Sequence, residues 1–207
     1  MKLSKIIFLL SCAFLFNSCA SGYKTINPTS LNYISNNTSN GVTLEYKYDL
    51  LNNKKYIKKE KKNGVRLIAI RIKNDTEKDL VFGKDIKLTY ENWNEIYIME
   101  TETIYKELKQ SPASYLWYLL LSPIQFYTTK TDAYGYTEQT SSFPVGLIAG
   151  PGLAGGNMIA ASSANAKLKK ELNDFSINGK IIKKGETVFG LIGIRAYNYN
   201  ALRLKIQ

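Results

Sequence analysis

Two blocks of short apolar runs, separated by a long uncharged stretch, limit what this chain of 207 residues can fold into. In the first block, residues 42–99, "VTLEYKY" alternates apolar and polar side chains, whereas "VRLIAIRIKN" at residues 65–74 is almost continuously apolar. Alternation is typical of a half-buried strand, and a continuous run is typical of a strand covered on both faces. Residues 180–206 repeat the pattern, with strands expected at 180–182, 187–196 and 202–206.

The two blocks together predict roughly seven or eight short strands joined by turns. Turn residues separate the apolar runs, as in "NDTEKD" at residues 74–79, and no helical period is evident between them. This pattern is typical of an antiparallel sandwich, so we predict a mainly β domain over residues 42–207. The blocks also resemble extracytoplasmic immunoglobulin-like domains, which implies an immunoglobulin-like sandwich but names no function.

Residues 101–173 interrupt this pattern. "TETIYKELKQ" has helical spacing, and Ser111–Pro112 has the form of a cap followed by proline at the first helical position. That helix is expected to end at Ser122, and a second helix is expected to follow Pro151 and reach Leu172. We therefore predict an Ala/Gly-rich helical hairpin inserted into the sandwich.

The insertion is almost free of charge. No charged residue occurs at positions 110–129 or 139–166, which raises the alternative of a hairpin inside a membrane. A helix over residues 112–122 would be only about 16 Å long, however, and a membrane span needs about 30 Å. Three interpretations remain: packing on the sheet or on "SYLWYLLL" at residues 114–121, contact with a membrane, and self-assembly.

Glycine spacing inside the insertion bears on this choice. Gly146 and Gly150, and then Gly152 and Gly156, are small residues four positions apart, a spacing that permits close packing of helices. The pairs resemble the glycine zippers of some envelope lipoproteins, although Pro151 separates them. These four glycines are the candidate positions for close helix packing.

The chain begins with the three parts of a secretory signal: two lysines, an apolar run at Ile6–Phe16, and small residues. A cysteine after such a run, preceded by a small residue, resembles the lipobox of bacterial lipoproteins, where cleavage precedes a cysteine that carries lipid. Cys12 and Cys19 compete for this role, and Cys19 has the full-length run before it and a polar stretch after it. The resemblance implies a signal peptide at residues 1–18 and lipid on Cys19.

The residues after Cys19 are rich in Ser, Asn and Thr, so residues 19–41 are expected to form the lipidated cysteine and a flexible tether. In such lipoproteins an Asp after the cysteine can retain the protein at the inner membrane, and this chain has Ala20 there. The composition also resembles lipoproteins of the Bacteroidota. These resemblances imply an outer-membrane location facing the periplasm; an ordinary cleaved signal with an incidental cysteine is the alternative.

Composition also limits the chemistry. The chain contains no histidine, and both of its cysteines lie at or before Cys19. This excludes His-dependent acid–base and nucleophilic catalysis and leaves the body of the chain without thiolate ligands. No pair of carboxylates has catalytic spacing, and "GLIAGPGLAGG" lacks the Lys-Ser/Thr of a phosphate loop. We expect no enzymatic activity, no metal site and no cofactor.

A run of lysines, "KKYIKKEKKNG", occupies residues 54–64. On a strand, four residues would share one face: Lys55, Ile57, Lys59 and Lys61. One interpretation of the run is a docking site for lipid headgroups or another polyanion. The alternative is a solvated hairpin whose lysines keep a sheet edge from pairing with other chains. The candidate contact residues are Lys54, Lys55, Lys58, Lys59, Lys61 and Lys62.

These features predict a lipid-anchored cell-envelope protein that acts as a non-enzymatic binding or accessory module at the outer membrane. The alternative is a membrane-associating or oligomer-forming envelope component that works through residues 101–173. Expected partners are the membrane, reached through the lipid anchor, and an envelope protein or a polyanion, which the net charge of +11 would attract. We expect no nucleic-acid partner, and the sequence does not fix the oligomeric state.

Overall fold

The computed structural model describes residues 19–207, so the predicted signal peptide at residues 1–18 and the alternative site Cys12 lie outside the described residues. The chain divides into two compact units, and each is described by itself. Unit 1 comprises residues 19–22 and 110–164 of the described chain, and unit 2 comprises residues 23–109 and 165–207.

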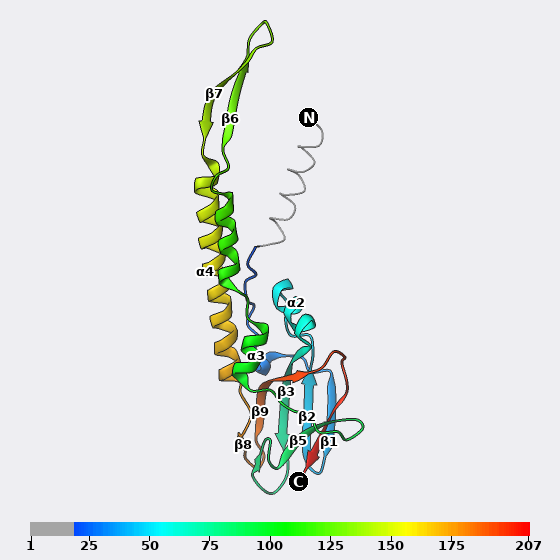
Figure 1. Ribbon diagram of the computed structural model, residues 1–207. Coiled ribbons are helices and arrows are strands. Elements are labelled where there is room, and N and C mark those ends of the chain that lie inside the picture. Colours follow the sequence, from blue (N-terminus) through cyan, green and yellow to red (C-terminus); the bar gives the residue numbers. More distant parts are fainter. Residues whose placement is uncertain (1–18) are drawn as a thin grey trace. The chain divides into compact units, whose positions relative to one another are not determined.

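The framework of unit 2 is a four-stranded antiparallel sheet in the order β1-β2-β3-β9, whose strands lie side by side in Figure 1. The central strand β3 pairs with β2 on one side and with β9 on the other. Its bounds are those of the continuous apolar run. The strands are β1 (Ser35–Ser39), β2 (Val42–Lys47), β3 (Val65–Asn74) and β9 (Thr187–Arg195).

Strand β3 is buried on both faces, which confirms the prediction from its apolar run. One face contributes three residues to the main core of unit 2: Ile68, Ile70 and Ile72. The other face carries three more buried residues: Val65, Leu67 and Ala69. The 3-10 helix η1 (Pro28–Ser30) and two helices, α2 (Lys54–Asn63) and α3 (Thr101–Leu108), contact β3. The approach of α3 to the sheet is close, because a Cβ at Gly193 would lie 2.5 Å from Cγ1 of Ile104.

Two short antiparallel pairs complete the main core of unit 2. β5 (Ile86–Tyr90) pairs with β10 (Leu202–Ile206), and β4 (Leu80–Val81) pairs with β8 (Ile181–Ile182). Apolar side chains from these pairs and from the four-stranded sheet form one buried cluster. Packing of this kind removes the apolar face of each sheet from water. The antiparallel, sheet-rich part of the predicted fold is therefore confirmed.

Helices make up about as much of the described chain as strands do, so the prediction of a mainly β protein is wrong in its proportions. Part of the extra helix comes from the lysine run, which forms α2 instead of the expected strand. Tyr56 and Glu60 are four residues apart and are the buried residues of α2, which is the helical spacing. Gly64 ends the helix in the left-handed conformation (φ 59°), and its N–H bonds to the last carbonyls.

Unit 1 contains the middle of the insertion, and the predicted helical hairpin is wrong in its first arm and in its loop. Its first arm is a 3-10 helix, η2 (Pro112–Leu121), and the expected polar loop is a β-hairpin of β6 (Phe126–Thr131) and β7 (Thr137–Phe143), visible beyond the helices in Figure 1. Two Thr/Ser hydroxyl pairs link the strands: Thr128–Ser141 at 2.5 Å and Thr131–Thr137 at 3.0 Å. Backbone pairing and hydroxyl contacts hold the hairpin without apolar alternation.

The second arm, helix α4 (Val145–Asp174), begins before Pro151 instead of after it. Proline inside a helix removes one backbone hydrogen bond and crowds the carbonyl four residues earlier. Pro151 is the seventh residue of α4, beyond the first four residues whose N–H groups have no partner in the helix. The helix loses one backbone hydrogen bond at Pro151 and continues to Asp174.

The predicted tether is also partly wrong. Within residues 19–41, η1 and the edge strand β1 are ordered elements of unit 2, and Ile26 is buried. β1 pairs with β2 from Ser35↔Tyr46 to Ser39↔Val42. The side chain of Asn37 in this strand accepts a hydrogen bond from the backbone N–H of Leu204 at 3.3 Å. Polar residues suffice for such an edge strand because its main contribution is backbone pairing.

Two of the candidate glycines mark the close approach of α4 to η2 inside unit 1. A Cβ at Gly146 would lie 1.9 Å from the carbonyl oxygen of Leu121, and one at Gly150 would lie 3.1 Å from that of Tyr118. Gly152 and Gly156 have nothing within 4 Å of the Cβ position. The glycine pairs therefore differ: the first permits contact within the chain, and the second leaves an open helix face.

We expect Gly146→Ala to lower the free energy of unfolding by about 1–3 kcal/mol, because backbone atoms cannot yield to the added methyl group. The matched control is Gly152→Ala in the same helix, which should be neutral or stabilise by up to about 1 kcal/mol through helix propensity. Far-UV circular dichroism during denaturant titration measures both. Equal effects of the two substitutions would contradict the packing of α4 on η2.

Candidate functional site

The residues directly after Cys19 are held inside unit 1. Cys19 itself is exposed. The backbone N–H of Ala20 donates to Oδ1 of Asn157 in α4 at 2.5 Å. Ser21 and Gln110 exchange two hydrogen bonds, from the Ser21 N–H to Gln110 Oε1 at 3.0 Å and from Gln110 Nε2 to the Ser21 carbonyl at 2.6 Å. Because Gln110 is buried, this pair fixes the chain next to the predicted lipidation site.

A small apolar core supports the same segment. Tyr115 and Tyr118 of η2 stack with ring centroids 6.4 Å apart and planes 3° from parallel. Both rings pack with buried alanines of α4, and Ala20 packs against this cluster together with Leu121 and Met158. The alanines are Ala154 and Ala161. Residue 20 is thus part of a folded unit and does not belong to a flexible tether.

Most of the large exposed apolar side chains of the protein lie on unit 1. We call this set the apolar surface of unit 1. Its members lie within the uncharged stretches 110–129 and 139–166, whereas the charged residues between positions 110 and 164, namely Lys130, Asp132 and Glu138, all lie between those stretches. Where exposed apolar side chains gather, they mark sites of membrane or protein contact. The set comprises Leu116, Trp117, Leu119, Leu120, Ile124, Phe126, Tyr127, Phe143, Leu147, Ile148, Leu153 and Ile159.

Helix α4 contributes to this surface along its uncharged part. Within the described chain it is the one helix long and apolar enough to cross a membrane by length and composition. Residues 145–166 are uncharged and about 33 Å long, against a hydrocarbon thickness of about 30 Å. Only 28% of its apolar window is buried, unlike the core helix of a typical globular domain.

In unit 2, the chain that follows the predicted anchor is also held by a polar network. The hydroxyl of Tyr23 donates to the Glu171 carboxylate, and the Tyr23 ring lies edge-on to Tyr56 of α2 with centroids 5.3 Å apart. Tyr56 in turn donates to Oδ1 of Asn165 at 3.2 Å. Burial raises the pKa of Glu171, and burial together with Glu171 raises the pKa of Tyr23. Segment 23–26 is therefore fixed against α2 and the end of α4.

The candidate lysines lie on α2. Lys54, Lys58, Lys61 and Lys62 are exposed, and Lys55 and Lys59 are partly exposed. The one acid of the helix, Glu60, is buried; its carboxylate accepts from the Leu67 N–H at 3.0 Å and lies 3.5 Å from Nη1 of Arg66. Burial raises the pKa of Glu60. The helix thus buries its acid and presents its lysines to solvent.

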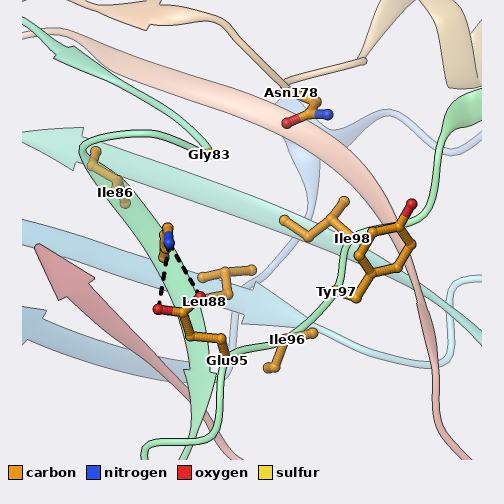
Figure 2. A pocket seen from close by; sticks show the side chains of 9 residues that line it. Gly83, Ile86, Leu88, Glu95, Ile96, Tyr97, Ile98 and Asn178 are labelled. Atoms are coloured by element: carbon orange, nitrogen blue, oxygen red, sulfur yellow. Dashed lines mark hydrogen bonds and ion pairs between the residues drawn. The ribbon is translucent and has the colours of Figure 1, made fainter. Parts of the chain in front are cut away.

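Unit 2 also contains an apolar groove of about 340 Å³, drawn in Figure 2. It forms where residues 95–98 change their pairing partner from β5 to β9. The Ile96 N–H donates to the Leu88 carbonyl of β5 at 2.9 Å, whereas Ile98 pairs with Ile194 of β9. The lining residues are Gly83, Ile86, Lys87, Leu88, Glu95, Ile96, Tyr97, Ile98 and Asn178.

The groove lacks a pair of groups for acid–base catalysis. Its Glu95 carboxylate contacts the amines of Lys87 at 3.1 Å and of Lys205 at 3.3 Å, and these bonds lower the pKa of Glu95. The dashed lines in Figure 2 mark the contacts of the Lys87 amine with Glu95. In the part of the chain that the structure describes, no group of three Cys, Asp or Glu side chains could hold a metal ion. The groove has the chemistry to hold an apolar side chain.

The chain matches no protein-family model, no curated protein and no solved structure. Function must therefore be argued from the residues of this chain alone.

Sequence reasoning missed the contacts that hold the segment after Cys19. Gln110 and Asn157 are polar residues within or beside uncharged apolar stretches. A polar residue in such a place indicates a buried hydrogen bond, and this was the one signal that the sequence offered. Tyr23 and Glu171 are 148 positions apart, so no local pattern could pair them.

The raised pKa of Glu171 gives stability a predictable dependence on pH. The folded protein holds this proton more tightly than the unfolded chain, so the contribution of Glu171 is largest below about pH 4.5 and declines as the pH rises through the folded-state pKa. We therefore expect the unfolding free energy of wild type, relative to that of Glu171→Gln, to fall as the pH rises through this range. Denaturant titrations at several pH values measure it.

Glu102→Gln is the control for this experiment. Lys169 lowers the pKa of Glu102. The unfolding free energy of wild type, relative to that of Glu102→Gln, should therefore rise as the pH rises. A Glu171→Gln difference that is flat with pH would contradict burial of this carboxyl group.

Proposed function

We propose that this protein is a lipid-anchored component of the cell envelope that associates with its membrane through unit 1 as well as through lipid on Cys19. The observation that supports this most is the connection between the two: Ala20 and Ser21, which directly follow Cys19, are bonded to Asn157 and Gln110 of the unit that exposes the apolar surface. A lipid on Cys19 would bring this surface to the bilayer.

Lipid on Cys19 and the apolar surface of unit 1 would act together as membrane anchors. Acyl chains insert by burying CH₂ groups, and stable anchoring by lipid commonly needs a second signal on the protein. The apolar surface of unit 1 supplies such a signal, because burying a large apolar side chain is worth about 1.5–3 kcal/mol. Trp117 and Leu120 are 74% and 68% exposed, so most of this burial is still available to a membrane.

The proposal also assigns a location, a fold family and a role to the protein. We place the protein at the outer membrane, facing the periplasm, because Ala20 stands where an inner-membrane lipoprotein would carry Asp. We propose that unit 2 is an immunoglobulin-like sandwich, since its sheets share one core. A non-enzymatic role, in which the groove beside β5 holds an apolar group of an envelope partner, is consistent with the absence of histidine from the chain.

Assembly through the β-hairpin is a second candidate function. Every residue of β6 and β7 is exposed, and a two-stranded hairpin without further support is marginally stable in water. Each strand has one edge that could pair with a second copy of this chain. Pairing between copies would add backbone hydrogen bonds and bury Phe126 and Phe143 at the base of the hairpin.

The proposal predicts that Cys19→Ala abolishes lipidation but leaves part of the protein in the membrane fraction after a high-salt wash. Adding Trp117→Glu and Leu120→Glu to this variant should release the protein into the soluble fraction, because charged groups are costly in hydrocarbon. Cell fractionation and mass spectrometry of Cys19 provide the measurements.

The matched control combines Cys19→Ala with Ile34→Glu and Tyr97→Glu, two apolar residues of unit 2 that are 82% and 77% exposed. This variant should behave like Cys19→Ala alone. Release of Cys19→Ala by salt would show that lipid is the sole apolar anchor, and an unlipidated wild-type Cys19 would disprove the anchor itself.

The second candidate predicts that replacing residues 126–143 with a short Gly/Ser loop reduces an oligomer to a monomer. Light scattering in detergent measures the size of both proteins, and circular dichroism checks that the sheet of unit 2 is retained. An unchanged size would rule out assembly through the hairpin.

A further inference from the structure

We propose that helix α2 binds the anionic phospholipid headgroups of the membrane that carries the lipid anchor. The inference rests on the proposed anchoring through Cys19 and assigns a second, electrostatic contact to the same membrane. It concerns the exposed lysines of α2 and the segment that packs against them.

Within residues 19–207, helix α2 carries six lysines and one acid. Glu60, the one acid of the helix, is buried with Arg66. Ion pairs elsewhere in residues 19–207 engage lysines such as Lys87, Lys170 and Lys184 with acidic partners. None of those ion pairs includes the following lysines of α2: Lys54, Lys58, Lys59, Lys61 and Lys62.

This arrangement is unfavourable for an isolated helix. Lys54 and Lys58, and also Lys58 and Lys62, are like charges four residues apart, which destabilises a helix. The first turn contains lysines and no acid, although the helix dipole favours negative charge there, and Asn53 makes no side-chain cap. An anionic surface would relieve both effects, so charge complementarity favours a polyanionic partner.

Chain connectivity brings this helix near the anchor. Tyr23 packs edge-on against Tyr56 of α2 with ring centroids 5.3 Å apart. Cys19 is four residues before Tyr23, and four residues can extend at most about 14 Å. A residue that carries lipid must lie at the membrane surface, so this contact holds α2 within a short distance of the headgroups. Clusters of four or more lysines beside a membrane anchor are attracted to anionic lipids.

The experiment uses the mature chain, residues 19–207, with Cys19→Ser so that lipid contributes nothing. Its binding to vesicles of phosphatidylcholine is compared with binding to vesicles that also contain phosphatidylglycerol. The ratio of the two affinities removes any contribution of the apolar surface of unit 1. We expect a ratio of at least about a hundredfold at low salt, which falls as salt is added.

Two charge-matched variants assign the effect. Lys54, Lys58, Lys61 and Lys62, all replaced by Gln, should bring the ratio close to one. The control replaces Lys78, Lys84, Lys180 and Lys183 by Gln; these are also exposed residues of unit 2 outside the observed ion pairs, and the ratio should stay near the starting value. Circular dichroism confirms that both variants remain folded.

Equal ratios for the two variants, or a starting ratio near one, would overturn the inference. Binding of soluble polyphosphate without binding to anionic vesicles would also overturn it, because the lysines would then serve a soluble polyanion. Failure of the anchor is detected separately, by an unlipidated Cys19 in the mass spectrum, so the two proposals can fail independently.

Discussion

Strand β3 must be covered on both faces, and most of unit 2 follows from that requirement. An apolar strand exposed on either side would leave several large side chains in water, at about 1.5–3 kcal/mol for each. β5, β10, β4 and β8 contribute to the core on one face, while α2, α3 and η1 contact the strand as well. Gly193 allows α3 to approach the sheet at the distance that this cover needs.

Sequence patterns were informative wherever burial controls the choice of residue. The bounds of β3 and of β10 follow from apolar runs, and the helical spacing at Ile104 and Leu108 marks α3. The type and bounds of these elements can be predicted because their apolar side chains must be removed from water. The groove beside β5 could not be predicted, since it depends on where residues 95–98 leave one strand for another.

Elements stabilised by backbone pairing or by distant partners were missed. β1, β6 and β7 consist largely of Ser, Thr and Asn, which carry no apolar signal of a strand. The lysine run permits alternation on a strand, but the burial of Tyr56 and Glu60 at helical spacing and the helix stop at Gly64 favour α2. Of the candidate site, Cys19 and the lysines were identified from sequence, but Gln110, Asn157 and Glu171, which hold the chain around them, were not.

The hydrogen bond from Tyr23 to Glu171 limits how far the protein can act from its membrane. A coil of some twenty residues would let a domain search a wide volume, whereas unit 2 begins at Tyr23, four residues after Cys19, and Ala20 and Ser21 between them are bonded within unit 1. Under the proposed anchoring, the protein cannot reach across the envelope to capture a distant partner. Whatever binds the sheet domain must come to the membrane surface, so the anchor also selects partners by where they are.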